Sequence, residues 1–349
     1  MSKKILIIGD MHLSDHLGYY QIIKDGRERE KQEILDFIIK TFEEKKCDGV
    51  VFMGDQFDKK NNPASVIKEF TKFVERFGDK PIYIIAGNHE LSPTGESALD
   101  YLKEISGKNW HIITDKMELI DNMLFCPYIY KAQLEASDDK DATEKLMQIF
   151  LTEAGKGKTF PLFTHFSISD TITSSGQNTN FFNEIVLDND SLHKVFNPVF
   201  SGHIHQPSER GDDFKKTIIT GSIFNQEVGE RGKNIFIYDY ETNKTETIKL
   251  PGRGIYKLEN PKKEDIDHIS KNNIVKVYIT DRKIDINKIK DSLKKFDGQV
   301  IVEQYPNERK KVVYENQLMD LNIENLLTLY AKQKGINIKT LMEAWSKIK

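Results

Sequence analysis

Short apolar runs that stop at a glycine recur through the first part of the chain and constrain its fold more than any other feature. Residues 4–8, 49–53 and 81–86 are typical of buried strands, because each is a short, largely apolar run followed by a glycine. Between them, residues 27–46 and 63–74 carry apolar side chains at helical spacing. This alternation of strand and helix predicts right-handed crossovers and a parallel sheet, and therefore an α/β fold.

The middle of the chain is expected to be richer in β-structure. The predicted elements there are paired strands within 117–130, a helix over 142–154, and strands over 160–164, 198–201, 217–223, 234–240 and 245–250.

A composition change after residue 250 predicts a domain boundary. Residues 251–254 read Pro-Gly-Arg-Gly, which interrupts regular structure. Beyond them we expect a small α/β unit followed by helices; its predicted elements are a strand over 273–280, a helix over 287–296, a strand over 299–304 and helices from about 323 to 348. The predicted parts are residues 1–252 (a catalytic domain), 253–316 (a small α/β cap) and 317–349 (a helical tail).

Histidines and acidic residues gather where the predicted strands end. Five of the nine histidines fall in five strand-end motifs, which are Asp10-Met11-His12, Gly54-Asp55-Gln56-Phe57-Asp58, Gly87-Asn88-His89-Glu90, Thr164-His165 and Gly202-His203-Ile204-His205. The carboxyl ends of strands in open α/β sheets converge on one crevice, so we expect these motifs to meet.

The residue types in these motifs fit divalent cations. Carboxylate, imidazole and amide oxygen together suit manganese, iron or zinc better than calcium, which prefers oxygen ligands alone. Two ions held close together need a carboxylate between them, and such a pair can clamp both the attacking and the leaving oxygen of a displacement.

In this order, the motifs D-x-H, G-D-x-x-D, G-N-H-[DE], a strand-end histidine and G-H-x-H resemble the calcineurin-like metallophosphoesterase superfamily, over roughly residues 3–250. The resemblance implies a four-layer αββα sandwich of two mixed sheets. It also implies two divalent metal ions, for which we expect Mn²⁺, with Mg²⁺, Fe²⁺ or Zn²⁺ as alternatives. The implied ligands are Asp10, His12 and His205 for the first ion, Asn88, His165 and His203 for the second, and Asp55 as the bridge.

The same resemblance assigns roles to residues that hold no metal. His89 matches a histidine that stabilises the transition state or protonates the leaving oxygen, and Asp58 matches the carboxylate that orients it. Outside the motifs, the candidates for substrate contact are His16, Lys59 and Lys60. The alternative for these three is an ordinary solvated surface position.

Further stretches resemble one branch of the superfamily, the SbcD-type and Mre-type double-strand-break nucleases. The resemblance lies in residues 202–207, 220–223 and 230–233, and in His12-Leu13 followed closely by residues 16–19. It implies a DNA nuclease, exonucleolytic on duplex ends and endonucleolytic on single strands. Implied partners are DNA, an SbcC/Rad-type SMC-like ATPase that docks on the helical tail, and a second copy of the chain. The alternative for the tail is packing on the chain's own cap.

Other members of the superfamily fit less well. A protein phosphatase usually continues the second motif with Arg-Gly, whereas Lys59 and Lys60 follow Asp58 here. A phosphodiesterase of cyclic or dinucleoside phosphates remains the second interpretation, although it needs no appendage of this size. An inactive scaffold for an ATPase ranks third, because every ligand type is present.

Charge and composition set looser limits. The 349-residue chain has a net charge of −3, yet residues 260–349 carry 18 Lys and Arg against 13 Asp and Glu, and residues 1–259 carry 33 against 41. A basic C-terminal part permits a nucleic-acid partner. Two cysteines exclude a disulfide framework and a cysteine-based zinc site. With no apolar run near the roughly 20 residues of a membrane span and no signal-peptide pattern, we expect a cytoplasmic protein, or one of the host cytoplasm if viral.

Overall fold

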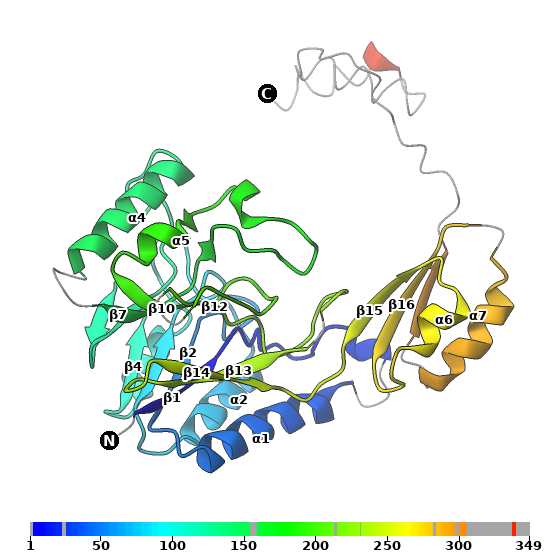
Figure 1. Cartoon of the computed structure of the whole chain (residues 1–349), viewed down its shortest axis with the longest axis horizontal. Helices are drawn as coiled ribbons and strands as arrows, with labels where there is room; N and C mark the ends of the chain where they lie inside the picture. The colour runs from blue at the N-terminus through cyan, green and yellow to red at the C-terminus, as the bar shows by residue number, and fades with distance from the viewer. Residues whose placement is uncertain are drawn as a thin grey trace. The chain divides into compact units, whose positions relative to one another are not determined.

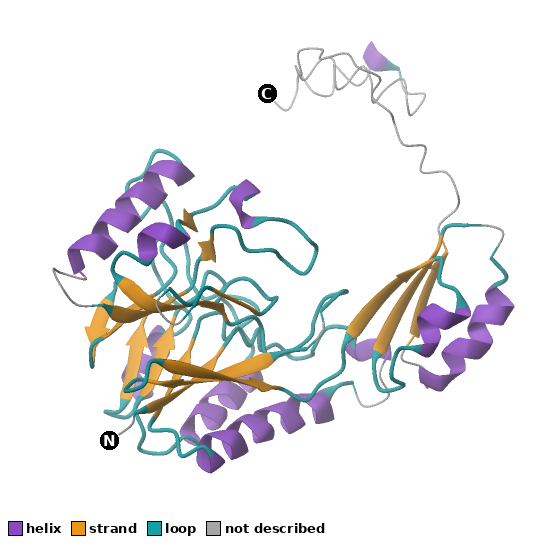
Figure 2. Cartoon of the chain, in the orientation of Figure 1, coloured by secondary structure: helices purple, strands orange, loops and turns teal. Residues whose placement is uncertain are grey.

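Two six-stranded sheets form the body of the protein and pack face to face (Figures 1 and 2). The structure, a computed structural model, describes residues 3–22, 26–153, 159–212, 215–230, 232–281, 284–296, 300–304 and 337–339.

The first sheet has the strand order β14-β13-β1-β2-β3-β4. Strands β1 to β4 are parallel, and β13 runs antiparallel to β1 and to β14, so the sheet is mixed. The strands are β1 (Lys4–Ile8), β2 (Gly49–Phe52), β3 (Ile82–Ile85), β4 (Trp110–Ile113), β13 (Asn234–Asp239) and β14 (Lys244–Lys249). The helices of this half are α1 (Glu28–Glu44), α2 (Ala64–Glu75) and α3 (Asp100–Ile105).

The second sheet has the order β11-β12-β10-β7-β6-β5 and is also mixed, because its four central strands are parallel and both edge strands antiparallel. Its strands are β5 (Glu118–Ile120), β6 (Met123–Cys126), β7 (Phe160–Thr164), β10 (Phe196–Ser201), β11 (Ser208–Arg210) and β12 (Thr217–Ile219). Helices α4 (Asp139–Glu153) and α5 (Asn189–Leu192) and a parallel pair, β8 (Ser167–Ile168) and β9 (Val186–Leu187), complete this half.

Alternation along the strands sorts the apolar side chains into separate layers. On β1, Ile5 and Ile7 pack into the core between the sheets, whereas Leu6 and Ile8 pack in the core that includes α1 and α2. Successive side chains of a strand point to opposite faces, so a continuous apolar run feeds two cores at once. A third core lies between the second sheet and α4. The predicted four-layer αββα sandwich is confirmed.

Most predicted elements are present, but one predicted strand is shorter and several short strands and helices have no counterpart in the sequence prediction. The strand predicted over 217–223 ends at Ile219, because Gly221 adopts a φ of 71° and Ser222 pairs with Asp10 instead. Strands β4 and β15 (Ile255–Glu259) have no counterpart in the sequence prediction. Both are short and carry polar or aromatic residues among the apolar ones, which weakens the strand pattern.

Beyond β14 the chain forms the small α/β unit, which we call the cap. It is a parallel sheet in the order β15-β16-β17, with its own apolar core, separate from the cores of the sandwich. Its remaining elements are β16 (Ile274–Ile279), β17 (Val300–Gln304), α6 (Lys263–Asp267) and α7 (Ile286–Leu293). The predicted domain boundaries stay predictions. Apart from residues 337–339, the predicted helical tail lies outside the described residues.

A buried ion pair at the start of α1 ties distant segments together. The Arg27 side chain is fully buried and donates two hydrogen bonds to the Glu30 carboxylate, at 2.8 and 2.9 Å. Its Nη1 donates to the main-chain oxygens of Gly18 and Asn225, at 2.6 and 2.8 Å. Glu30 Oε1 also accepts the main-chain N–H of Arg253, at 2.8 Å, in the segment that leads into the cap. One residue pair therefore joins three loops.

Replacing Arg27 with alanine should lower the free energy of unfolding by roughly 3–5 kcal/mol, because Glu30 is left as a buried charge without its partner. Denaturation in urea measures the loss. Arg29→Ala is the matched control, since Arg29 is exposed and pairs with Glu33 one turn along the same helix. We expect Arg29→Ala to leave stability nearly unchanged. Equal losses in the two variants would contradict the role of the buried pair.

Candidate metal centre

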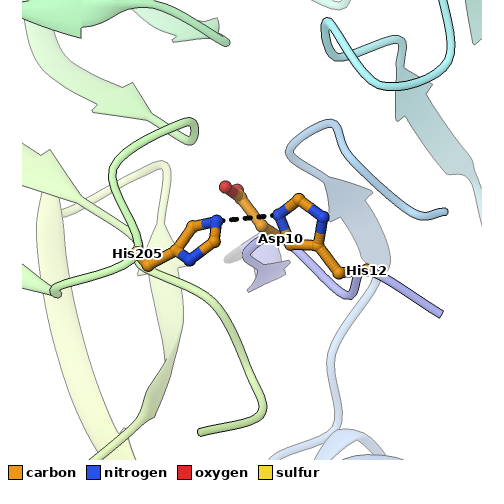
Figure 3. A group of neighbouring side chains, drawn as sticks. All are labelled: Asp10, His12 and His205. Carbon is orange, nitrogen blue, oxygen red and sulfur yellow. Dashed lines mark hydrogen bonds between the residues drawn. The ribbon is translucent and has the colours of Figure 1, made fainter. Parts of the chain in front are cut away.

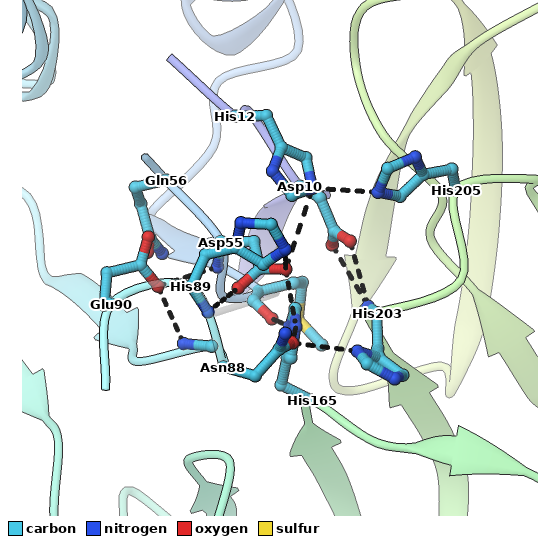
Figure 4. A network of polar contacts seen from close by, with 12 residues as sticks. Asp10, His12, Asp55, Gln56, Asn88, His89, Glu90, His165, His203 and His205 are labelled. Atoms are coloured by element: carbon cyan, nitrogen blue, oxygen red, sulfur yellow. Dashed lines mark hydrogen bonds and ion pairs between the residues drawn. The ribbon is translucent and has the colours of Figure 1, made fainter. Parts of the chain in front are cut away.

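The five strand-end motifs meet at one place, between the two sheets (Figure 4). Three of the predicted ligands, His12, Asp55 and His203, have positive φ angles of 45°, 49° and 77°. Side chains other than glycine seldom adopt this conformation, and such residues cluster at functional sites. The backbone is thus bent where it delivers these side chains.

The predicted ligands of the first ion form one group (Figure 3). Asp10, His12 and His205 offer ligand atoms that all lie within 4.8 Å of one another. The Nε2 atoms of His12 and His205 are 2.8 Å apart. Asp10 is fully buried, and its Oδ2 accepts the main-chain N–H of His203 at 3.0 Å.

The predicted ligands of the second ion form another group, on the other side of Asp55. Asn88 Oδ1 lies 2.9 Å from Nδ1 of His203 and 3.3 Å from Nε2 of His165. Asp55, His165 and His203 also offer ligand atoms within 4.8 Å of one another.

Asp55 lies between the groups. Its Oδ2 is 3.6 Å from His12 Nε2 and 3.2 Å from His165 Nε2, and its side chain is almost completely buried. One carboxylate can therefore reach both positions, which is the arrangement that two adjacent cations need.

The polar contacts on the far side of each imidazole, hydrogen bonds for His165 and His203 and an ion pair for His205, test whether the rings fit metal ions. His165 donates from Nδ1 to the main-chain oxygen of Met53 at 2.7 Å. His203 Nε2 lies 3.1 Å from both carboxylate oxygens of Glu184, and His205 Nδ1 lies 3.4 Å from Glu230 Oε1.

An acceptor on the outer nitrogen of a ring leaves the lone pair of the neutral imidazole on the inner nitrogen, as in protein metal ligands. In His165 and His203 that inner nitrogen faces carboxylate or amide oxygens of the site, and in His205 it faces Nε2 of His12. The donor set therefore fits a divalent metal.

Two glycines are needed for close approach. A Cβ on Gly87 would lie 2.1 Å from Asp55 Oδ1, and one on Gly202 would lie 2.6 Å from Asp10 Oδ1. No side chain fits at these distances, so the strand ends can come this near to the buried carboxylates only because a glycine stands there.

The comparison with protein families agrees with this geometry. A family model described as calcineurin-like phosphoesterase matches residues 3–207. The chain belongs to this family. The match reaches from the first strand past His205 and so includes every predicted ligand. The predicted membership is confirmed, and with it a metal-dependent hydrolase of phosphoesters.

Two curated relatives of this chain carry the name DNA double-strand break repair protein Mre11. The protein of Methanocaldococcus jannaschii is 28% identical over 366 aligned residues, covering 94% of this chain and 91% of the relative. The protein of Methanococcus maripaludis is 26% identical over 286 aligned residues, which cover 78% of this chain and 69% of the relative. A solved structure of a novel archaeal phosphodiesterase is 17% identical, with a TM-score of 0.36, and covers 71% of this chain and 99% of its own. Similarity at that level carries no information about function.

His89, the family's predicted non-ligand histidine, lies beside the bridge. Its main-chain N–H donates to Asp55 Oδ1 at 3.0 Å, and its Nε2 is 4.0 Å from Asp55 Oδ2. The resemblance implies that the Asp58 carboxylate orients His89, but the structure places the main-chain oxygen of Asp58 against this ring. The main-chain oxygen of Asp58, 2.7 Å away, accepts from His89 Nδ1, whereas the Asp58 carboxylate lies 4.0 Å from His12 Nδ1. Asp58 thus orients the His89 ring through its backbone.

Glu90 joins two ligand loops. Its fully buried carboxylate accepts the main-chain N–H groups of Asp55 (3.0 Å), Gly87 (2.9 Å) and Phe57 (2.7 Å). Burial and the neighbouring charge of Asp55 raise the pKa of Glu90 to about 8, against the effect of those donors. Glu90 therefore fastens the loop of Asp55 to the loop of Asn88.

The three candidates for substrate contact are not in the metal groups. His16 is half-exposed, stacks on Tyr20 with ring centroids 4.0 Å apart, and lies 3.7 Å from Glu28. Lys60 pairs with Glu96 at 3.1 Å, and Lys59 is exposed. Their contact with substrate stays a prediction.

Two acidic residues of the site were missed. Glu184 lies in a loop before β9 with no recognisable motif, so nothing in the sequence singles it out. Glu230 opens the Glu-Arg-Gly-Lys stretch that contributed to the nuclease resemblance. Its place in this stretch was the only sequence signal for Glu230. That signal does not indicate that the side chain reaches His205.

Charges in the site are strongly coupled. Burial favours the neutral form of His165, yet the carboxylates of Asp55 and Asp10 raise the pKa of this imidazole to about 10. Burial would raise the pKa of Asp55, but His165 and His12 hold it well below its usual range. Because His165 Nδ1 already donates to Met53, the additional proton at neutral pH is on Nε2, where a metal would bind.

Metal binding should therefore displace a proton. We expect Mn²⁺ to release about one proton per chain at roughly pH 8, and the apparent affinity to rise with pH until His165 loses its proton unaided. Calorimetric titrations in two buffers of different ionisation enthalpy measure the release. Equal observed enthalpies in both buffers would contradict it.

Proposed function

We propose that this chain is a two-metal-dependent DNA nuclease, acting as an exonuclease on duplex ends and an endonuclease on single strands. The observation that carries the proposal is the Asp55 carboxylate, which reaches both groups of ligand atoms. Support for DNA as the substrate comes from the relatives named as Mre11 repair proteins, one of which aligns with 94% of the chain, more than the catalytic sandwich alone.

The proposed chemistry is hydrolysis of a phosphodiester. Two bound cations would supply Lewis-acid activation of water and of the phosphate, held by the seven predicted ligands. Asp55 sets the spacing of the pair. His89 Nε2 faces the same space while Nδ1 donates to the main-chain oxygen of Asp58, so the doubly protonated ring would direct its Nε2–H at the leaving oxygen.

One face of the cap sheet carries two lysines beside an aromatic ring, with Glu259 on the same face. Lys257 and Lys276 lie over the ring of Tyr278, with Nζ 5.3 and 5.2 Å from its centroid. By strand alternation they share a face with Ile255 and Ile274, which cluster with Tyr19 and Val228 of the sandwich. Lysines bind phosphates without reading sequence, and an aromatic ring can stack on bases.

The finer parts of the proposal concern the metal, partners and location. We propose Mn²⁺ as the metal, a homodimer as the assembly, and an SbcC/Rad-type SMC-like ATPase as a partner that binds the helical tail. A DNA substrate implies the compartment that holds DNA, the cytoplasm of a cell or of a viral host. Among the described residues, no helix combines the length and apolarity needed to cross a membrane.

Two substitutions separate chemistry from metal binding. His89→Ala should keep both metals but lower turnover about 100-fold or more, because the ring acts on the leaving oxygen. Asp55→Asn should lose metal affinity itself. Nuclease assays and Mn²⁺ titrations measure the two effects.

His268→Ala is the control, because His268 is an exposed histidine of the cap, outside the site. Wild-type turnover in the His89 variant would remove that residue from the mechanism.

A substrate panel distinguishes the proposal from its alternative, a phosphodiesterase of cyclic or dinucleoside phosphates. With Mn²⁺, we expect cleavage of linear duplex DNA and of single-stranded DNA to exceed that of cyclic nucleotides, a dinucleoside polyphosphate and a phosphopeptide. Lys257→Glu with Lys276→Glu should weaken cleavage of DNA but not of a small phosphodiester. Preference for a cyclic nucleotide would favour the alternative.

A further inference from the structure

The loop between β12 and β13 lies between the cap and the first metal group. It contains Glu230, which is fully buried although it is a carboxylate in a loop. Its Oε2 accepts the main-chain N–H groups of Gln226 and Glu227, at 2.6 and 3.1 Å. These bonds fix the carboxylate, and its other oxygen, Oε1, points at His205 Nδ1, 3.4 Å away.

Lys233 contacts the main chain of the same histidine, His205. Its side chain is buried, and Nζ donates to the main-chain oxygen of His205 at 2.8 Å and to Ser222 Oγ at 2.7 Å. The ammonium also lies 3.3 Å from Glu230 Oε1, which balances the buried charge. Ring and backbone of His205 are therefore both fixed by this one loop.

The backbone of that loop is paired with the cap. Ile255, the first residue of β15, donates its N–H to the main-chain oxygen of Glu230 at 3.1 Å and accepts the N–H of Gly229 at 2.8 Å. Val228 packs on Ile255 and Ile274 of the cap sheet. A single residue, Glu230, thus contacts the cap through its main chain and the metal ligand through its side chain.

We propose that Glu230 is a positioning residue that couples the first strand of the cap to the metal ligand His205. A displacement of β15 moves the Glu230 backbone, and with it the carboxylate that orients the His205 ring. The position of the cap thereby sets the affinity of the first metal group, Asp10, His12 and His205. This inference rests on the metal centre of the proposed function but not on DNA as its substrate.

The test is a Co²⁺ titration of the full chain, followed by the visible absorption of the bound ion. Glu230→Gln should weaken one of two sites by about 10- to 100-fold and change its spectrum, because the ring loses its orienting charge. The second site should keep its wild-type affinity and so serves as an internal control for folding. Glu227→Gln is the comparison within the loop and should have a smaller effect. A carboxylate oxygen of Glu227 lies within 4.8 Å of the ligand atoms of His205 and Glu230, but Glu227 is exposed and makes no ion pair with His205 among the described contacts.

A reciprocal variant assigns the sites. Glu184 contacts His203 in the second group as Glu230 contacts His205 in the first. Glu184→Gln should therefore weaken the other site and leave the one affected by Glu230→Gln unchanged.

Two substitutions at Ile255 test the connection with the cap. Ile255→Pro removes the N–H that donates to Glu230 and changes no side chain of the metal centre. It should reproduce the weakened site and altered spectrum of Glu230→Gln. Ile255→Ala keeps the N–H and should show a smaller change, since only the packing on Val228 is reduced.

Three results would overturn the proposal. The first is Glu230→Gln with wild-type Co²⁺ affinity at both sites. The second is an equal effect of Glu227→Gln. The third is an Ile255→Pro variant that unfolds at a lower temperature in EDTA but binds Co²⁺ at both sites with wild-type affinity. That result would mean that the contact between β15 and Glu230 only stabilises the fold. Failure of the proposed function is distinct, because two normal Co²⁺ sites without cleavage of DNA would leave the coupling intact.

Discussion

Electron-rich atoms that face one another need a cation between them, and this constraint organises the centre of the protein. Asp55 Oδ2 lies 3.6 Å from His12 Nε2 and 3.2 Å from His165 Nε2, and Asn88 Oδ1 lies 3.3 Å from the same nitrogen of His165. Burying such groups together is costly without compensating charge. The carboxylates of Asp55 and Asp10 raise the pKa of His165, so a proton on this imidazole supplies part of that charge. Divalent cations supply more, so the fold itself creates affinity for metal.

The sandwich makes this arrangement possible because the parallel strands of both sheets end at the same place. Three ligand loops follow β1, β2 and β3 of the first sheet, and two follow β7 and β10 of the second. Loops from the two sheets meet this closely at Gly202, beside Asp10, because the backbone there carries no side chain, and Gly87 allows the same close approach to Asp55 within the first sheet. Glu90 then fixes the distance between neighbouring loops through three main-chain N–H groups.

The local sequence pattern was sufficient for an α/β fold and for the residues at the strand ends, whereas the four-layer sandwich was implied by the family resemblance. Asp10 and His203 are far apart in the chain, but each follows an apolar run, and strand ends converge. Glu184 and Glu230 could not be found this way, since they reach the site from irregular loops whose path depends on tertiary packing. The role of the Asp58 main chain was hidden for another reason, because every residue has a carbonyl and no residue type marks the one that is used.

The two metal groups are supported from different parts of the chain, and this separation has a physical consequence. His203 is oriented by Glu184, from the loop before β9, whereas His205 is oriented by Glu230, from the loop paired with the cap. Only Asp55 belongs to both groups. A change at one support can alter one cation position while the bridge and the other position keep their geometry. The proposed binuclear centre, built in this way, would respond to the cap at one ion without losing the other.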